Sequence, residues 1–527
     1  MSWRPSDRGG IAGRLAGGPL GFVLVTGHLP DSDEVDDAVD LPEQMRVRHQ
    51  KRAELLERGQ APYAAGFRRT HTLAELRAAH SDLEPGGTTG VNVSIAGRVI
   101  HLRNTGKLCF ARLREGGGAE LQVMLSLDRV GEEALRDWKH LVDIGDYVGV
   151  EGEVVSSKRG ELSVQAERWT VVAKALRPLP VAHKALSDET KTRQRYVDLI
   201  VNPDAREMVR TRAAVLRSIR ETLDSQGFVE VETPVLQLVH GGAAARPFHT
   251  HLNAFDLPMT LRIALELHLK RAIVGGIDKV YEIGRIFRNE GIDSAHSAEF
   301  TMLEVYEAYG DYDTMATLTR MLVLEAASTT GHTVISDGAG GELDLEAPWH
   351  RVTLHEAVSN AVGEELTIGT DPSRLRELAG KYDVHVEDDW GHGEIMLELF
   401  EKLVQRTLRT PTFVCDYPES VRPLARPHRQ DPRLTEAWDL IIAGIELAPA
   451  YSELTDPVIQ RERLIAQSEL AARGNPEAMV VDEDFLRALE YGMPPTGGMG
   501  LGIDRLLMLL TGTGIRDTIL FPLVKPE

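Results

Sequence analysis

The stretch YEIGRIFRNEG (281–291), continued by HSAEFTMLEVYEAY (296–309), predicts a strand, a charged loop and a returning strand. Alternation along the returning strand places four side chains on one face, namely Phe300, Met302, Glu304 and Tyr306. A carboxylate and a phenol therefore share a face with an aromatic ring, and Arg288 lies in the preceding loop. Such a face is typical of a pocket floor, although an acid on a half-buried strand also commonly points to solvent.

Three acids, Asp439, Glu446 and Glu453, lie along the mostly apolar run AWDLIIAGIELAPAYSEL (437–454). Acids within a buried strand need partners. Carboxylate oxygens suit Mg²⁺, which often bridges a carboxylate to substrate phosphates. Magnesium binding and ordinary salt bridging are both compatible with these three residues.

The segment PPTGGMGLGIDRLLMLL (494–510) predicts a glycine-rich turn that leads into a helix with Arg505 in its first turn. An arginine at a helix N-terminus is well placed to bind phosphate. The segment lacks the GxxxxGK[ST] pattern, which argues against a P-loop nucleotide site.

The composition excludes several classes of protein. A chain of 527 residues has room for about three domains. The net charge of −21 means that a nucleic-acid partner needs a local basic patch. Two distant cysteines, Cys109 and Cys415, form neither a disulfide framework nor a zinc site, so we expect a cytoplasmic protein. The apolar stretch at 17–27 is too short to span a bilayer, and we expect residues 1–41 to be a disordered extension with no membrane contact.

Residues 42–90 are expected to form an N-terminal helical segment. Its first helix, at 42–58, is basic and carries Arg46, Arg48, Lys51, Arg52 and Arg58. Such a helix is either a solvated charged face or an electrostatic contact for a polyanion.

Residues 91–175 predict five short strands, with a helical stretch at 132–142 between the third and the fourth. This order matches an oligonucleotide-binding (OB-fold) β-barrel, and a generic small barrel is the alternative. Phe110 and Gln122 lie in adjacent strands and Glu161 opens the last one. Together they would provide a stacking platform with two polar groups for unstacked bases.

Residues 176–203 contain three prolines around a basic run and are expected to be a linker. The larger domain, 204–527, should begin with a helix that has Asp204 as its N-cap, followed by a strand that ends at Pro234. Residues from about 340 to 410 predict a helical insert within this domain.

Several segments together resemble class II aminoacyl-tRNA synthetases of subclass IIb. FVEVETP (228–234), FRNEG…EFTMLEVY (287–306) and GLGIDR (500–505) are similar to motifs 1, 2 and 3. Within the subclass, the chain resembles bacterial lysyl-tRNA synthetases over nearly all of 42–526, including LRPLP (176–180), RQRYVDLI (193–200), GGAAARPF (241–248), YSEL (451–454) and IRDTILFP (515–522).

The resemblance implies an α+β fold. It consists of an OB-fold anticodon-binding barrel, followed by a catalytic domain on a mixed, mainly antiparallel sheet with flanking helices. The implied activity is ATP-dependent formation of lysyl-adenylate and transfer of lysine to tRNA(Lys). Catalysis would rest on positioning and charge neutralisation rather than on a protein nucleophile.

The implied residue roles follow from the matching motif positions. Arg288 would bridge the α-phosphate and the attacking carboxylate, and Arg505 would bind the γ-phosphate. ATP would also contact Glu290 and His296 and stack on Phe300. Magnesium ligands would be Glu446 and Glu453, supported by Asp439.

The resemblance also implies which residues would bind lysine and tRNA. The lysine pocket would be formed by Gly242, Glu266, Glu304, Tyr306 and Glu453. The anticodon would be read by Phe110, Gln122 and Glu161, with Phe110 stacking on the central uridine. Motif 1, including Pro234, would form a homodimer interface.

The chain departs from the family at five positions near the expected pocket. Leu265 and Ala298 replace prolines, and His268 stands where an aromatic residue is common. Pro449 and Ala450 replace a polar residue and a glycine. Alanine at a position that requires positive φ would cost roughly 1 kcal/mol or more.

Three alternatives remain open on the sequence alone. The first is a divergent paralogue with weakened or altered amino-acid specificity. The second is a catalytically silent RNA-binding or nucleotide-sensing module. The third, a ligase for aspartate or asparagine, would require a cation or an amide reader where this chain has acids. Unpaired acids would disfavour a neutral substrate.

Overall fold

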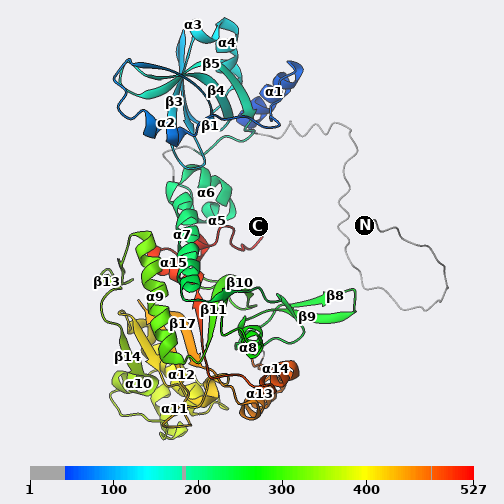
Figure 1. Cartoon of the computed structure of the whole chain (residues 1–527), viewed down its shortest axis with the longest axis vertical. Helices are drawn as coiled ribbons and strands as arrows, with labels where there is room; N and C mark the ends of the chain where they lie inside the picture. Colours follow the sequence, from blue (N-terminus) through cyan, green and yellow to red (C-terminus); the bar gives the residue numbers. More distant parts are fainter. Residues whose placement is uncertain (1–41, 181–184, 476, 527) are drawn as a thin grey trace, which may run out of the picture. The chain divides into compact units, whose positions relative to one another are not determined.

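The computed structural model describes residues 42–180, 185–475 and 477–526, which divide into two compact units between Leu179 and Pro180 (Figure 1). The extension predicted at 1–41 lies outside the described residues. No helix in the described part of the chain is long and apolar enough to cross a membrane.

The first unit is a closed five-stranded barrel with strand order β1-β2-β3-β5-β4. Its elements are α1 (Glu43–Glu57), α2 (Leu73–Ala79), β1 (Thr88–Asn104), β2 (Leu108–Arg114), β3 (Glu120–Ser126), α3 (Leu127–Val130), α4 (Glu132–Leu141), β4 (Tyr147–Ser156) and β5 (Leu162–Ala173). The alternating β-branched residues fill the interior, and Trp138 of α4 is fully buried among them. The predicted OB-fold arrangement, with a helix between the third and fourth strands, is confirmed.

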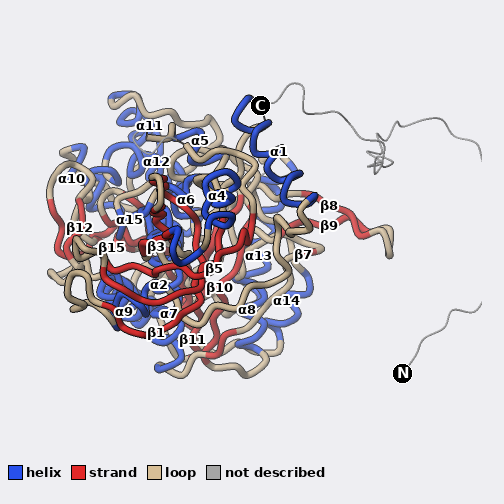
Figure 2. Tube along the Cα trace, turned by 90° about the horizontal axis from the view of Figure 1, so that it is seen from above, coloured by secondary structure: helices blue, strands red, loops and turns tan. Residues whose placement is uncertain are grey.

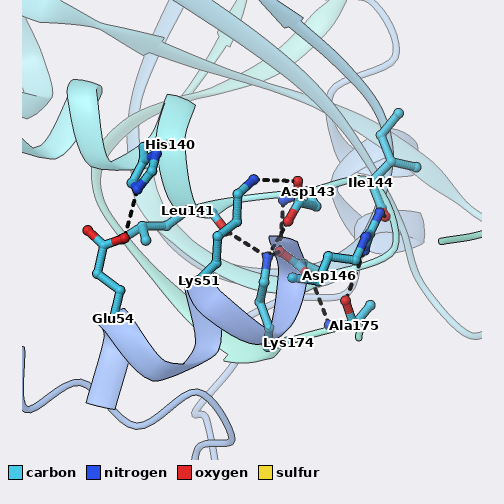
Figure 3. A network of polar contacts seen from close by, with 10 residues as sticks. Lys51, Glu54, His140, Leu141, Asp143, Ile144, Asp146, Lys174 and Ala175 are labelled. Atoms are coloured by element: carbon cyan, nitrogen blue, oxygen red, sulfur yellow. Dashed lines mark hydrogen bonds and ion pairs between the residues drawn. The ribbon is translucent and has the colours of Figure 1, made fainter. Parts of the chain in front are cut away.

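The basic helix α1 is attached to the barrel by its charged side chains (Figure 3). Lys51 Nζ lies 2.7 Å from Asp143 Oδ1, and Arg48 donates to the carbonyls of Ala175 and Ile144, both at 2.9 Å. Asp143 and Asp146 also hold the fully buried Lys174, at 2.6 and 2.7 Å. Arg48 and Lys51 are therefore structural, which neither sequence interpretation of this helix anticipated.

The predicted linker is shorter than expected. Two helices, α5 (Asp188–Arg193) and α6 (Arg195–Val201), lie within 176–203 and belong to the second unit. Buried Arg195 fixes them, since it pairs with Asp198 at 2.9 Å and donates to the carbonyl of Arg516 at 2.6 Å. The next helix, α7 (Pro203–Ser225), is capped by Asn202 rather than by Asp204, because the Asn202 side chain accepts from the Asp204 N–H and Pro203 occupies the first turn.

The second unit is built on an eight-stranded sheet with order β14-β15-β16-β17-β18-β11-β10-β6. The strands are β14 (His350–Thr353), β15 (Thr412–Cys415), β16 (Ala437–Ile442), β17 (Ile445–Ser452), β18 (Thr496–Gly502), β11 (Glu299–Ala308), β10 (Lys279–Phe287) and β6 (Val229–Glu230). Only the outermost pairs, β14 with β15 and β6 with β10, are parallel. The mixed, mainly antiparallel sheet is thus confirmed.

Two sequence interpretations of this sheet were wrong. The glycine-rich segment at 496–502 is the buried strand β18 rather than a turn, and it pairs with both β11 and β17. The apolar run 437–454 is a hairpin rather than one strand, because Ala443 and Gly444 turn the chain with positive φ values of 52° and 78°.

Helices cover both faces of the sheet (Figures 1 and 2). On one face, α7 and α9 (Tyr312–Thr330) pack against Leu303, Val305 and Leu501. The opposite face contacts α8 (Glu266–Val274), α13 (Pro457–Ala472) and α14 (Glu483–Glu490). A cavity opens on this second face, and Phe300, Met302, Glu304 and Tyr306 of β11 line it.

The remaining elements extend the unit around this sheet. The predicted insert contains three helices, α10 (Leu354–Val362), α11 (Pro372–Lys381) and α12 (His392–Leu403), followed by the 3-10 turn η1 (Gln405–Thr407). A second 3-10 turn, η2 (Glu419–Val421), precedes the hairpin, and α15 (Ile503–Thr511) and α16 (Ile515–Thr518) follow β18. Small sheets are formed by β12 (Val334–Ser336) with β13 (Glu342–Asp344), and by β7 (Leu236–Gln237), β9 (Leu257–Leu261) and β8 (His249–Leu252). The β8–β9 hairpin projects from the unit (Figures 1 and 2).

Candidate active site

A cavity of about 370 Å³ lies over β11, β17 and β18. Its lining includes all the residues to which the sequence predictions give roles in ATP, amino-acid or metal binding, and those roles stay predictions: Gly242, Glu266, Arg288, Glu290, His296, Phe300, Glu304, Tyr306, Asp439, Glu446, Glu453 and Arg505. These residues come from positions as distant as 242 and 505. The fold therefore gathers the whole predicted set around one cavity.

One end of the cavity is lined by three buried carboxylates, Glu266, Glu304 and Glu453, and each is at most 5% exposed. Fully buried Lys270 pairs with two of them, at 2.6 Å from Glu266 Oε1 and in direct contact with Glu453 Oε2. Glu453 Oε1 has no hydrogen-bond partner among the described residues. The cluster thus holds three carboxylates and one ammonium group.

Burial changes the protonation of this cluster. Desolvation, reinforced by neighbouring Glu266, raises the pKa of Glu304 to about 7. Desolvation also raises the pKa of Glu453 to about 8, against the opposing effect of Lys270. Burial alone would lower the pKa of Lys270, but Glu266 and Glu453 outweigh it and the pKa is raised. The ammonium of Lys270 is therefore charged, whereas Glu304 and Glu453 exchange protons near neutral pH.

Glycine is required beside this cluster at Gly242, whose φ is +86°. A Cβ atom there would lie 3.0 Å from the Cβ of Ala264 and 3.1 Å from the Cβ of Glu266. Backbone thus closes over the amino-acid end of the cavity, as expected for Gly242.

The loop between β10 and β11 brings Arg288 into the cavity. Its N–H donates to the carbonyl of Ala298 at 2.9 Å, and its guanidinium lies 5.3 Å from the centroid of the Phe300 ring. Burial lowers the pKa of Arg288 from its usual value. On the same loop, Glu290 accepts from the Arg246 N–H at 3.2 Å, and His296 hydrogen-bonds Asp293 at 2.9 Å.

Arg505 lies in the first turn of α15 and faces the same cavity. Its Nη1 donates to the carbonyl of Glu446 at 2.8 Å, and its Nη2 lies 3.5 Å from His296 Nε2. The adjacent Asp504 fixes this turn, because its carboxylate accepts from the Thr301 N–H at 2.7 Å and from Arg212 at 2.6 Å. Arg505 and Arg288 therefore supply two guanidinium groups held by separate elements.

The three predicted magnesium ligands do not form one cluster. No group of three or more His, Cys, Asp or Glu side chains in the described part of the chain is arranged to hold a metal ion. Glu453 is engaged by Lys270, and Asp439 Oδ2 pairs with Arg422 at 2.5 Å, whereas Glu446 is half-exposed beside Arg505. The hairpin turn explains the separation, since Asp439 lies on β16 and the two glutamates on β17 and just after it.

The five departures from the family pattern occupy different places. Pro449 and Ala450 line the cavity, but Leu265, His268 and Ala298 do not. Ala450 does not have a positive φ, so the expected backbone strain is absent. Pro449 lies where β17 no longer pairs with β18, which is a position that tolerates proline.

In the barrel, the three predicted reading residues lie on β2, on β3 and immediately before β5, which are neighbouring strands. Phe110 is half-buried on β2 and pairs in register with Met124. Gln122 donates to Ser163 Oγ at 2.9 Å, and Glu161, just before β5, lies 3.3 Å from Arg77. Exposed Arg103, opposite Phe110 on β1, was not singled out from the sequence, although the register of the two strands would have revealed it.

Sequence reasoning also missed Lys270 and Arg422. Lys270 lies four residues after Glu266 on α8, so helical spacing signals the pair. Arg422 follows η2 and reaches Asp439 only through the fold, and no local pattern indicates this contact.

The barrel, the antiparallel sheet and the two guanidinium groups define a class II tRNA synthetase with an N-terminal OB-fold domain. The family model for tRNA synthetases class II (D, K and N) matches residues 187–525, and that for the OB-fold nucleic acid binding domain matches residues 93–172. Relatives include a lysine–tRNA ligase of Mycolicibacterium gilvum (56% identical, covering 94% of this chain and 99% of the relative) and lysine–tRNA ligase 1 of Mycobacterium tuberculosis (55%, 93% and 99%). The chain belongs to the lysine–tRNA ligase family within that class.

The chain is also 47% identical to the lysylphosphatidylglycerol biosynthesis bifunctional protein LysX of Nocardia farcinica. That match covers 94% of this chain and 44% of the longer relative.

Proposed function

We propose that this chain activates L-lysine with ATP and transfers it to tRNA(Lys). The observation that carries the proposal is the charge of the amino-acid end of the cavity. Three buried carboxylates and one buried ammonium leave two negative charges when all are ionised. L-lysine brings two ammonium groups, so its binding completes the pairing of these buried charges.

Other amino acids fit this lining poorly. Aspartate would bring a second carboxylate to three existing ones, and asparagine would leave at least one acid without a cationic partner. Buried charges without partners cost several kcal/mol, roughly. The lysine carboxylate would point toward Arg288, where charge neutralisation brings it close to the α-phosphate of ATP.

The ATP end of the cavity would hold the nucleotide through five residues. Adenine would stack on Phe300, with Glu290 and His296 beside it. Arg288 would neutralise the α-phosphate and Arg505 the γ-phosphate. No protein nucleophile is needed, because the substrate carboxylate itself attacks phosphorus and pyrophosphate leaves.

Magnesium is expected with ATP, as is general for this family, and the donor set allows it. Glu446 presents a half-exposed carboxylate beside Arg505. Asp439 lines the cavity, and its buried Oδ1 has no hydrogen-bond partner among the described residues. Mg²⁺ bound by one or two carboxylates and by phosphate oxygens would neutralise charge on the leaving pyrophosphate. Glu453, which Lys270 engages, would serve the lysine pocket instead.

The proposal extends to tRNA and to assembly. Phe110, Gln122 and Glu161 would read the anticodon from the barrel. A homodimer is supported by apolar side chains exposed around motif 1, with Val229, Leu236 and Leu238 exposed by 51%, 45% and 65%. Mass photometry should report a dimer. The buried free cysteines are compatible with work in the cytoplasm.

The deciding experiment is ATP–pyrophosphate exchange with each of the twenty amino acids, followed by aminoacylation of tRNA(Lys). We expect exchange with L-lysine alone. Exchange driven by another amino acid would identify a paralogue of altered specificity. If none of the twenty amino acids drives exchange but tRNA binding is retained, an RNA-binding role would be favoured.

A further inference from the structure

The carboxylate of Glu304 receives one hydrogen bond from the backbone. The Leu265 N–H donates to Glu304 Oε1 at 2.9 Å. Leu265 is fully buried and is the residue immediately before α8, so packing and the first turn of that helix fix the direction of its N–H. The donor is therefore rigid, unlike a side-chain donor.

The second oxygen of the same carboxylate is also held. Tyr306 Oη donates to Glu304 Oε2 at 3.1 Å. A carboxylate accepts about four hydrogen bonds, so two donors still leave acceptor positions for an ammonium group of the substrate. Leu265 and Tyr306 thus fix the orientation of the Glu304 carboxylate without occupying all of its acceptor positions.

We propose that Leu265 is a positioning residue that uses its backbone N–H to hold Glu304 ready for the amino-acid substrate. This inference rests on the proposed function, since it concerns the affinity for lysine. It adds a residue that does not line the cavity and whose side chain has no chemistry of its own.

The hydrogen bond matters because Glu304 lies among other acids. The titratable and charged groups around it are Glu266 of α8 and Glu453 at the end of β17, both paired with Lys270 of α8, together with Tyr306 of β11, Arg288 after β10, and Glu282 of the neighbouring strand β10, which pairs with Arg262 just after β9. The Leu265 N–H opposes the desolvation that raises the pKa of Glu304. Without this N–H, Glu304 would hold a proton to higher pH and would rotate more freely.

Leu265 is one of the positions where this chain departs from the sequences that it resembles, which have proline there. Proline has no N–H to donate. The departure therefore introduces the hydrogen bond to Glu304, and substitution by proline removes it.

The test compares Leu265→Pro with Leu265→Met in the full-length protein. Methionine keeps both the N–H and the approximate volume of the buried side chain. In lysine-dependent ATP–pyrophosphate exchange, we expect L265P to raise KM for lysine by about tenfold or more, as for a lost hydrogen bond to a charged group, with KM for ATP little changed. The acid limb of kcat/KM for lysine should also move to higher pH. L265M should behave like the wild type in both respects.

If the wild type is active with lysine and L265P and L265M have equal KM values for lysine, the inference is overturned and the proposed function stands. If lysine drives no exchange by the wild type, both the inference and the proposed function are overturned. If L265P does not fold, Leu265 is replaced by its α-hydroxy acid through nonsense suppression. That exchange removes the same N–H and introduces no ring, and an unchanged KM would then refute the positioning role.

Discussion

At the residue scale, the cavity divides its charged groups between two tasks. Lys270 and the three carboxylates form the amino-acid end, and Arg288 and Arg505 serve the ATP end. Period-two alternation was enough to predict that Phe300, Glu304 and Tyr306 share a face. It could not reveal Lys270, because the contact with Glu453 joins α8 to the end of a strand almost two hundred residues away along the chain.

Arg288→Ala tests the ATP end. The guanidinium would neutralise the charge that opposes attack of one anion on another, so we expect exchange activity to fall by a factor of at least about 10² to 10³ while the fold is retained. Arg285→Ala is the matched control, because Arg285 is exposed on β10, three residues before Arg288, and does not line the cavity. Near-normal exchange by the Arg288 variant would refute the assignment.

The raised pKa of Glu304 predicts a pH dependence for lysine binding. Glu304 in the empty site has a pKa of about 7 and must lose its proton to pair with an ammonium group. The contribution of Glu304 to affinity is therefore present well above pH 7 and is lost as the pH falls through this value, and Glu453, with a pKa of about 8, adds a dependence of the same sign at higher pH. We expect KM for lysine to rise by up to about tenfold per pH unit below 7. Glu304→Gln should remove the part of this dependence that is centred near pH 7 and leave the part that Glu453 contributes, and a KM that is constant from pH 6 to 8 in the wild type would contradict the role of Glu304.

At the element scale, the central strand β18 was the main feature that sequence patterns missed. Four of its seven residues are glycine, a composition that usually indicates a turn. The sheet instead uses glycine because neighbouring side chains occupy the space where Cβ atoms would lie. A Cβ at Gly498 would overlap Glu453 Oε1 and lie 2.5 Å from Tyr306 Cε1. The strand therefore forms the floor of the amino-acid pocket, and the absence of a side chain at Gly498 leaves space for Glu453 and Tyr306.

Gly498→Ala should thus damage lysine binding specifically. The added methyl group would displace Glu453 and Tyr306, so we expect KM for lysine to rise by about tenfold or more, whereas the affinity for ATP should change less. Gly502→Ala is the control on the same strand. The three atoms nearest to a Cβ there are side-chain carbons of Arg505, and the nearest lies at an ordinary 3.5 Å. Similar KM values for lysine in the two variants would argue against a steric role of Gly498.

At the scale of the whole molecule, the sequence predicted the order and type of the two units better than the junction between them. The barrel strands follow a clear alternation with turns between them, and the first unit has the five expected strands. The linker was predicted to be too long because prolines flank the segment that forms two short helices. Arg195 fixes these helices by donating a hydrogen bond to the carbonyl of Arg516, more than three hundred residues away in the sequence. Contacts of that kind leave no local pattern.

Separate units for anticodon reading and catalysis predict separable defects. Phe110 lies on the barrel, and no barrel residue lines the catalytic cavity described above. Phe110→Ala removes one aromatic platform, which is worth about 1–3 kcal/mol per stacked base. We therefore expect KM for tRNA(Lys) in aminoacylation to rise by roughly tenfold to a hundredfold, with lysine-dependent exchange unchanged. Tyr147→Ala is a suitable control, because Tyr147 is a 37% exposed aromatic residue on β4, a strand that pairs with neither β2 nor β3. Equal loss of both activities in the Phe110 variant would show that the barrel acts on folding or on the adenylation step rather than on the anticodon.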